Sequence, residues 1–200
     1  GWRDVPHDLD AVGVRARETC PDIKQVVLAN PGLEALAFER RLYVIRRRIE
    51  THIAAEALAP AGTFYISSLS ARVVVYKGLL MAHQVRPFYP DLDAGDLETA
   101  IAVVHQRYST NTFPSWPLAQ PFRYLCHNGE INTLRGNINK MHAREATCAA
   151  DAWGEDIAKL LPVIHDEDGS DSACFDNALE LLHLSGRSLL GTQIQRNIRD

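Results

Sequence analysis

Apolar residues recur at near-helical spacing in three stretches of the chain, and we predict a helix over each of them. In the longest stretch, Leu36, Tyr43 and Ile53 recur with Arg and Glu residues between them. Gly62 follows this stretch and Gly186 follows the last one, and glycine commonly ends a helix. The predicted helices span residues 33–57, 133–149 and 170–184.

Short runs rich in β-branched and aromatic residues predict strands before and between these helices. The runs cover residues 25–29, 63–68, 72–76, 100–105 and 124–127. Residues 1–21 contain Pro6 and Pro21 and are predicted to be irregular, and residues 79–94 are predicted to be loop with some helix. Because strands and helices are mixed without strict βαβ alternation, the pattern indicates an α+β domain with largely antiparallel sheets.

The bulk composition is that of an ordinary globular protein. Of the 200 residues, 46% are hydrophobic and 23% are charged, and the formal net charge is -4. A negative chain argues against a nucleic-acid binder, which would usually carry a basic face. We interpret Arg46-Arg47-Arg48 as a solvated helix face. No apolar run reaches the roughly 18 residues of a membrane span, so we expect no membrane segment.

The spacing of cysteines and histidines supports neither a metal site nor a disulfide framework. No Cys-x-x-Cys pair exists, and the lack of a secretory signal favours reduced thiols in a cytosolic protein. The histidines lack paired ligand spacing, and the acidic run 166–168 lacks calcium-loop spacing, which favours a solvated loop. The residues concerned are Cys20, Cys126, Cys148, Cys174, His105, His127, His142, His165 and His183.

The densest polar cluster lies in two blocks, residues 105–116 and 127–133, and each block follows a predicted strand. Strand ends on a rigid scaffold are common places for ligand-binding groups. In the first block, Arg107 could hold a substrate carboxylate in a bidentate fork, or it could form an internal salt bridge. The sequence pattern around Arg107 leaves both roles open.

The second block contains Asn128-Gly129, where a side-chain amide and a glycine N–H lie side by side. These two donors could point at one oxygen, as an oxyanion hole requires. The alternative is a type I′ hairpin turn, for which Asn-Gly is a strong signal. Asp171 lies ahead of the last predicted helix and could bind an ammonium group or, like Ser170, cap the helix.

Two long strings give the chain a family resemblance. Residues 105–116 read HQRYSTNTFPSW and residues 126–137 read CHNGEINTLRGN. They resemble the glutaminase (class II glutamine amidotransferase) domain of glutamate synthase large chains. This resemblance covers residues 1–189 and implies an α+β fold, the four-layer αββα sandwich of N-terminal-nucleophile hydrolases. We interpret residues 1–189 as part of such a domain and residues 190–200 as a divergent tail, left by truncation or a change of reading frame.

The resemblance also implies roles for individual residues. Arg107 would bind the α-carboxylate of glutamine, and Asp171 would bind its α-ammonium. Ser109-Thr110 would line the same pocket, and Asn128-Gly129 would form the oxyanion hole. The family's nucleophile is a cysteine at the mature N-terminus, whose α-amino group can act as the base. Because Gly1 matches an interior part of the domain, we expect that cysteine upstream and the sandwich incomplete here.

The function implied by the resemblance is hydrolysis of glutamine to glutamate and ammonia, which then aminates 2-oxoglutarate reductively. The remaining synthase domains would hold FMN and an iron–sulfur cluster, whereas this chain would hold no cofactor. An electron-transfer subunit or ferredoxin would be a partner, in the cytoplasm or a plastid. Without the nucleophile, this chain alone is expected to be inactive. The alternative is a non-catalytic glutamine-binding or structural module that has lost the nucleophile.

The chain departs from the family pattern at a few positions. Pro117 and Gln120 stand where the resemblance leads us to expect Arg and His, beside the pocket loop, and Lys140 stands in place of an expected Trp.

Overall fold

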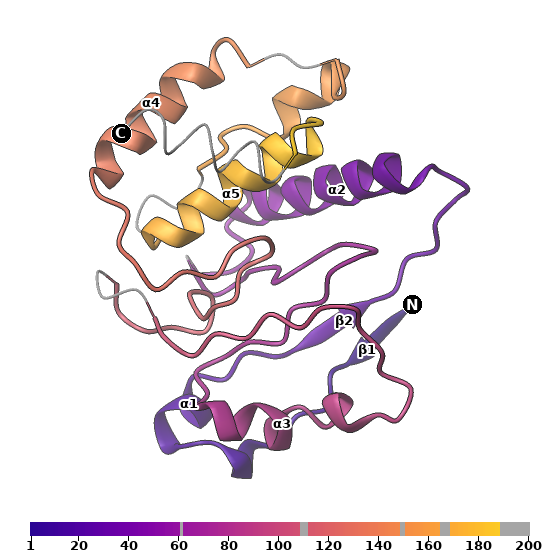
Figure 1. The fold of residues 1–200 in the computed structure, drawn as a ribbon, viewed down its shortest axis with the longest axis vertical. Helices are drawn as coiled ribbons and strands as arrows, with labels where there is room; N and C mark the ends of the chain where they lie inside the picture. The colour runs from indigo at the N-terminus through magenta and orange to yellow at the C-terminus, as the bar shows by residue number, and fades with distance from the viewer. Residues whose placement is uncertain (61, 109–111, 149–150, 165–168, 189–200) are drawn as a thin grey trace.

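The computed structural model describes residues 1–60, 62–108, 112–148, 151–164 and 169–188. The longer helices gather at one end of the molecule, and extended segments run from them toward a small sheet and two short helices (Figure 1). The helical end contains α2 (Ala35–Ala55), α4 (Leu134–Glu145), α5 (Asp171–Leu184) and the 3-10 turn η4 (Gly154–Lys159). The rest contains β1 (Trp2–Asp4), β2 (Lys24–Val26), α1 (Val14–Glu18), α3 (Val85–Phe88), η1 (Leu9–Ala11), η2 (Ala82–Gln84) and η3 (Pro90–Asp93).

The three predicted helices are confirmed, with their ends shifted by a few residues. Helix α5 begins after Ser170, whose hydroxyl accepts a hydrogen bond from the Ala173 N–H at 3.1 Å. Ser170, and not Asp171, is therefore the cap of this helix. Gly186 follows α5 with φ of 100°, a left-handed conformation that glycine adopts readily. None of the described helices is both long and apolar enough to cross a lipid bilayer.

Most of the predicted strands do not join a sheet within the described part of the chain. The exception is 25–29, which overlaps β2, and β2 pairs antiparallel with β1 so that Trp2 lies opposite Val26. The prediction of an irregular segment at 1–21 is wrong in part, since β1, η1 and α1 lie there, whereas the loop with some helix at 79–94 is confirmed. The unpaired runs are 63–68, 72–76, 100–105 and 124–127.

The physical reason is that a strand needs a partner as well as a propensity. β-branched residues favour extended backbone, but a ladder forms only where another strand offers its edge. In the run 100–105, Ile101 is 78% exposed and Val104 is 81% exposed, so no strand or helix among the described residues covers them. The described architecture is therefore mixed α and β, with few strands.

Two apolar clusters form the core. One joins α2, α4 and α5 around Tyr43 and Leu181, and the other lies around Phe88 and Trp116. The Trp116 ring packs so closely on Gly78 that a Cβ at that position would lie 2.3 Å from it. Since Trp116 ends the polar block 105–116, the second cluster fixes one end of that block.

The prediction that Arg46-Arg47-Arg48 forms a solvated face is wrong for its first two members. Arg46 is 1% exposed and Arg47 is 2% exposed. Both guanidiniums contact Glu50, at 2.9 Å and 2.7 Å, and Arg46 also pairs with Glu180 of α5. Buried charges persist when they are paired and hydrogen-bonded. This burial could not be predicted locally, because the partner Glu180 on α5 lies 134 residues away in the chain.

Lys77 is another buried cation. It is 8% exposed, and its Nζ donates a hydrogen bond to the Pro117 carbonyl. The rings of Tyr65 and Phe122 lie 5.5 Å and 5.0 Å from that nitrogen. Burial, together with the nearby Arg123 charge, lowers the pKa of Lys77 to about 7, although Asp176 opposes the shift. Native Lys77 therefore loses its proton far more readily than an exposed lysine does.

This pKa predicts a pH-dependent contribution of Lys77 to stability. An unfolded lysine has a pKa of about 10.4, so between that pH and about 7 the unfolded state binds one proton more than the native state. Stability from this group therefore rises with pH above about 7. Relative to wild type, Lys77→Met should lose about 1 kcal/mol of unfolding free energy per pH unit between about pH 7 and 8.5. Urea unfolding of the 200-residue chain measures it.

The matched control is Lys159→Met, since that side chain is 47% exposed. Its difference from wild type should stay constant over the same pH range. A constant difference for Lys77→Met as well would mean that the Lys77 ammonium is not buried in the native state.

Candidate functional site

Asn128-Gly129 does not form the type I′ turn that its sequence could specify. Neither residue has a positive φ, which that turn requires at both central positions. The His127 imidazole packs directly on Gly129, where an added Cβ would lie 2.9 Å from ring atoms Cε1 and Nε2. Both residues of the pair are exposed, as donors that meet a ligand must be.

Gln120 holds the backbone just before this pair. Its Oε1 accepts a hydrogen bond from the His127 N–H at 2.8 Å, and its Nε2 donates to the His127 carbonyl at 3.3 Å. The Gln120 side chain is buried. Between these two residues, the Phe122 N–H donates to the Leu125 carbonyl at 2.8 Å. Residues 120–127 therefore form a loop closed by the contacts between Gln120 and His127, and Asn128 follows this loop directly.

Two acidic side chains of α5 fasten this segment on both sides of the pair. Asp176 is fully buried and accepts hydrogen bonds from the N–H groups of Tyr124, at 2.7 Å, and Arg123, at 3.3 Å. Burial raises the pKa of the Asp176 carboxyl, although the Arg123 charge opposes the shift. Asp171 accepts a hydrogen bond from the Ile131 N–H at 2.6 Å. Helix α5 is therefore the support on which Asn128-Gly129 is held.

Asp171 is 1% exposed. Its Oδ2 bonds to Ile131, and its Oδ1 accepts from the Ser172 N–H at 2.7 Å and the Ser172 hydroxyl at 3.2 Å. These contacts anchor the loop and place the carboxylate beside Ile131, in the segment after Gly129, although the two residues are 40 positions apart in the chain.

Arg107 is exposed, and its backbone N–H donates to His105 Nδ1 at 3.2 Å. Its guanidinium makes no hydrogen bond or ion pair with any residue that the structure describes, so the internal salt bridge has no partner there. No described contact brings Arg107 to Asp171 or to Asn128. Ser109-Thr110 lie outside the described residues.

Three buried polar atoms in the two polar blocks have no hydrogen-bond partner among the described residues. They are His105 Nε2, Thr112 Oγ1 and His127 Nδ1. Buried polar atoms are nearly always paired, and an unpaired one costs about 1–3 kcal/mol. All three lie in the two blocks that carry the candidate residues.

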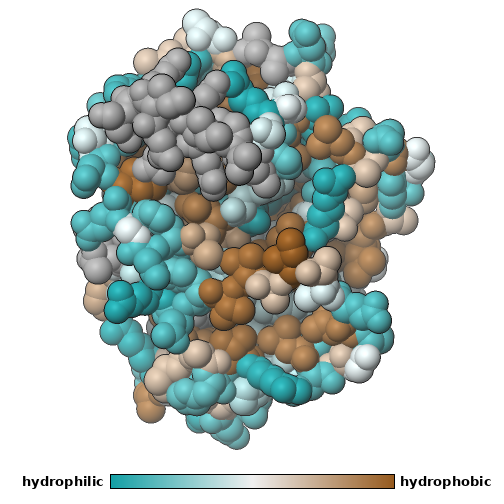
Figure 2. Space-filling model, in the orientation of Figure 1, coloured by the Kyte–Doolittle hydropathy of each residue, from teal (hydrophilic) through white to brown (hydrophobic). Residues whose placement is uncertain are grey.

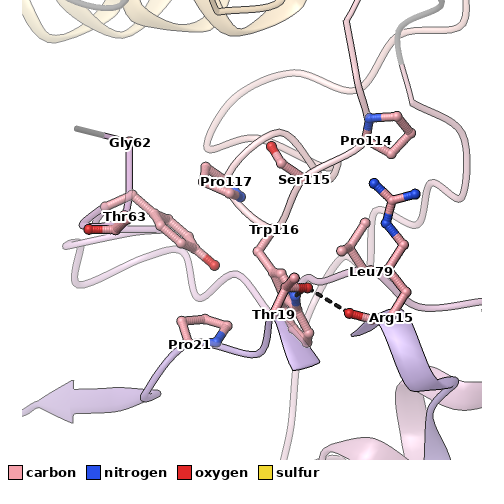
Figure 3. Close-up of a pocket in the computed structure, with 11 residues that line it drawn as sticks. Arg15, Thr19, Pro21, Gly62, Thr63, Leu79, Pro114, Ser115, Trp116 and Pro117 are labelled. Atoms are coloured by element: carbon pink, nitrogen blue, oxygen red, sulfur yellow. Dashed lines mark hydrogen bonds between the residues drawn. The ribbon is translucent and has the colours of Figure 1, made fainter. Parts of the chain in front are cut away.

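A cavity of about 280 Å³ lies beside Trp116, and none of the predicted site residues lines it. At its rim the Thr19 hydroxyl donates to the Arg15 carbonyl at 2.8 Å, and the Trp116 indole N–H points at Thr19 (Figure 3). The cavity is therefore separate from the candidate donors. Its lining residues are Arg15, Thr19, Pro21, Gly62, Thr63, Tyr65, Leu79, Pro114, Ser115, Trp116 and Pro117.

The residues that hold the candidate site were not predicted from the sequence. Gln120 stood out only as a departure from the family pattern, and the contacts between Arg123 and Asp176 join positions 53 residues apart. One signal was present: Asp171, Asp176 and Glu180 interrupt an otherwise largely apolar helix. Buried carboxylates on such a helix need partners, and here the partners come from the loop 120–131.

Comparison with known proteins gives consistent matches. The family model for glutamine amidotransferases class-II matches residues 1–194. Glutamate synthase [NADPH] large chains of Bacillus subtilis and Azospirillum brasilense are 49% and 48% identical over 189 residues, which are 94% of this chain and 12% of those proteins. Glutamate synthase [NADH] of Saccharomyces cerevisiae is 43% identical over 192 residues, 93% of this chain and 9% of that protein. The chain thus spans at most 12% of the length of these relatives.

Proposed function

Because the chain belongs to the class-II glutamine amidotransferases, we propose that it serves as the glutaminase part of a glutamate synthase. The observation that carries the proposal is the fixed conformation of Asn128-Gly129. The pair is exposed, has no left-handed residue, and is held from both sides by Gln120 and α5. Rigidly placed donors of this kind are what an oxyanion hole requires.

In the proposed reaction, a cysteine thiolate of the longer chain attacks the side-chain amide carbon of glutamine. The negative charge that develops on the amide oxygen is stabilised by the Asn128 side-chain amide and the Gly129 N–H. Ammonia then leaves, and water hydrolyses the acyl-enzyme to release glutamate. In this step, the residues of this chain stabilise charge and position the substrate.

The charged ends of glutamine would be bound by residues on either side of the oxyanion pair. Arg107 would hold the α-carboxylate in a bidentate fork, and Ser109-Thr110 would line that part of the pocket. Asp171 would bind the α-ammonium, a pairing of opposite charges. The free guanidinium of Arg107 supports this assignment, since no carboxylate among the described residues occupies it.

We infer that the longer chain completes the domain as a four-layer αββα sandwich, of which residues 1–189 are part and residues 190–200 a divergent tail. Ile101, Val103 and Val104 are all more than half exposed in an extended run, which favours pairing with further strands. Figure 2 shows apolar side chains gathered on the face between the helical end and the small sheet. The boundary at residue 189 lies outside the described residues.

The ammonia would pass to a second site, where 2-oxoglutarate is aminated and reduced. We assign FMN and an iron–sulfur cluster to the other domains of the longer chain. The cluster would be held there by several cysteine thiolates. In the described ranges, no three His, Cys, Asp or Glu side chains gather as metal ligands. Electrons would come from a small electron-transfer subunit or ferredoxin, and the enzyme would work in the cytoplasm or a plastid.

The proposed function is tested with a full-length chain that carries this sequence. It should convert glutamine to glutamate and ammonia, and it should also form glutamate from added ammonia. Glutamine binding without hydrolysis would favour the alternative, a glutamine-binding module without catalysis. Absence of both binding and hydrolysis would reject the proposal.

Arg107→Lys in the same chain should raise KM for glutamine about tenfold with little change in kcat. A guanidinium fork matches a planar carboxylate with two parallel hydrogen bonds, which an ammonium cannot reproduce. A charge-assisted hydrogen bond contributes about 1.5–3 kcal/mol. The carboxylate is held equally in the ground and transition states, so the loss falls on KM. Steady-state kinetics measure both constants.

The control substrate is 4-aminobutanamide, which keeps the amide and the amine of glutamine and lacks the α-carboxylate. Its turnover should be nearly the same for the wild type and Arg107→Lys. If both substrates suffered equally from the substitution, Arg107 would be supporting the fold, and its assignment to the substrate pocket would be wrong.

A further inference from the structure

The loop 120–127, which directly precedes Asn128-Gly129, is closed by the Gln120 side chain, and the proposed reaction does not use this side chain. Gln120 makes two hydrogen bonds, and both go to the backbone of His127, the residue before the pair. One amide side chain thus imitates a pair of strand-to-strand hydrogen bonds. Gln120 is 7% exposed, so water competes little for these contacts.

The orientation of His127 sets that of its neighbours. Its imidazole lies against Gly129, close enough to exclude a Cβ there. A rotation of the His127 peptide groups would therefore move both the Asn128 side chain and the Gly129 N–H. Ile131, on the other side, is fixed by Asp171. Gln120 is therefore the anchor nearest to Asn128 on its N-terminal side, and Asp176 holds Arg123 and Tyr124 further upstream.

We propose that Gln120 is a positioning residue for the oxyanion pair, acting through the backbone of His127. The inference rests on the proposed function and deepens it. Gln120 does not touch the substrate in this proposal; it fixes the direction in which the Asn128 and Gly129 donors point. Donors fixed before the reaction stabilise the transition-state oxyanion without reorganising, and a small misplacement can cost up to about a hundredfold in rate.

The test uses the full-length chain and its Gln120→Met variant, which keeps the side-chain length and removes both hydrogen bonds. The kcat for glutamine hydrolysis should fall about tenfold to a hundredfold, with KM changed less than about twofold. Glutamate formation from added ammonia should persist, which shows that the variant is folded. Asn30→Ala is the matched control, because Asn30 also clamps a loop backbone, at Gly32 and Leu33, and kcat should not change.

A double-mutant cycle with Asn128→Ala separates positioning from general stability. If Gln120 acts through the pair, Gln120→Met should cost at least about threefold less in the Asn128→Ala background than in the wild type. Equal losses in both backgrounds, an effect confined to KM, or an unchanged kcat would each overturn the inference.

Gln120→Glu provides a second variant if Gln120→Met does not fold, as judged by loss of the ammonia-dependent activity. It retains an acceptor for the His127 N–H, which makes the shorter of the two hydrogen bonds. Its kcat should therefore be lower than that of the wild type and higher than those of Gln120→Met and Asn128→Ala. A Glu variant as slow as Asn128→Ala would overturn the inference. A wild type without glutaminase activity rejects the proposed function itself, whereas an active wild type with additive losses rejects only the role of Gln120.

Discussion

Asn128→Ala in a full-length chain should lower kcat for glutamine hydrolysis by about 10²–10³-fold, the usual loss when one oxyanion donor is removed. The KM for glutamine should change little, because the donor acts on charge that develops only in the transition state. The Gly129 N–H remains, so some activity should persist. The structure supports this expectation because the backbone on both sides of Asn128 is anchored to α5. The N–H groups of Tyr124 and Ile131 donate to aspartate side chains of that helix, and the Asn128 side chain takes no part.

The measurement is steady-state ammonia release from glutamine, with glutamate formation from added ammonia in parallel. The second activity should survive, since it needs only the distant synthase site. Asn139→Ala, an exposed asparagine on α4, is the matched control and should leave both activities intact. If Asn128→Ala abolished both activities together, Asn128 would be a structural residue, and the proposed oxyanion hole would have to be abandoned.

Glu180→Gln should destabilise the 200-residue chain by about 3–5 kcal/mol, the typical cost of breaking a buried ion pair from one side. Glu180 is 6% exposed and pairs with both Arg46 and Arg123. The neutral amide would leave three buried or partly buried arginines with two carboxylates. The arginines of this network are Arg46, Arg47 and Arg123, and the remaining carboxylates are Glu50 and Asp176.

Urea unfolding followed by tryptophan fluorescence gives the free energy of unfolding of both proteins. Asp93→Asn is the control, because the Arg86–Asp93 pair is exposed and such pairs contribute only about 0–1 kcal/mol. Equal, small effects of the two substitutions would show that the Glu180 network is hydrated and does not hold α2 to α5.

The amino-acid sequence was sufficient for the local features of this protein. Helical spacing and capping residues located α2, α4 and α5, because a helix satisfies its hydrogen bonds within one segment. The strings at 105–116 and 126–137 indicated the family, and the family match and the relatives confirm it. The roles of Arg107 and Asp171 in binding glutamine remain predictions.

Tertiary structure alone decided what depends on distant partners. The predicted strand at 100–105 pairs with no strand among the described residues, because its propensity cannot supply a neighbouring edge. Arg46 is buried and not solvated, because it pairs with Glu180. Local sequence could not indicate this pair, since Glu180 lies 134 residues away. Asn128-Gly129 could form a type I′ hairpin turn by local preference, but neither residue has the positive φ of that turn. The flanking contacts of Gln120 with His127 and of Asp171 with Ile131 hold the backbone on either side of the pair. Local sequence favours certain conformations, and long-range hydrogen bonds and buried charges determine which of them the folded protein adopts.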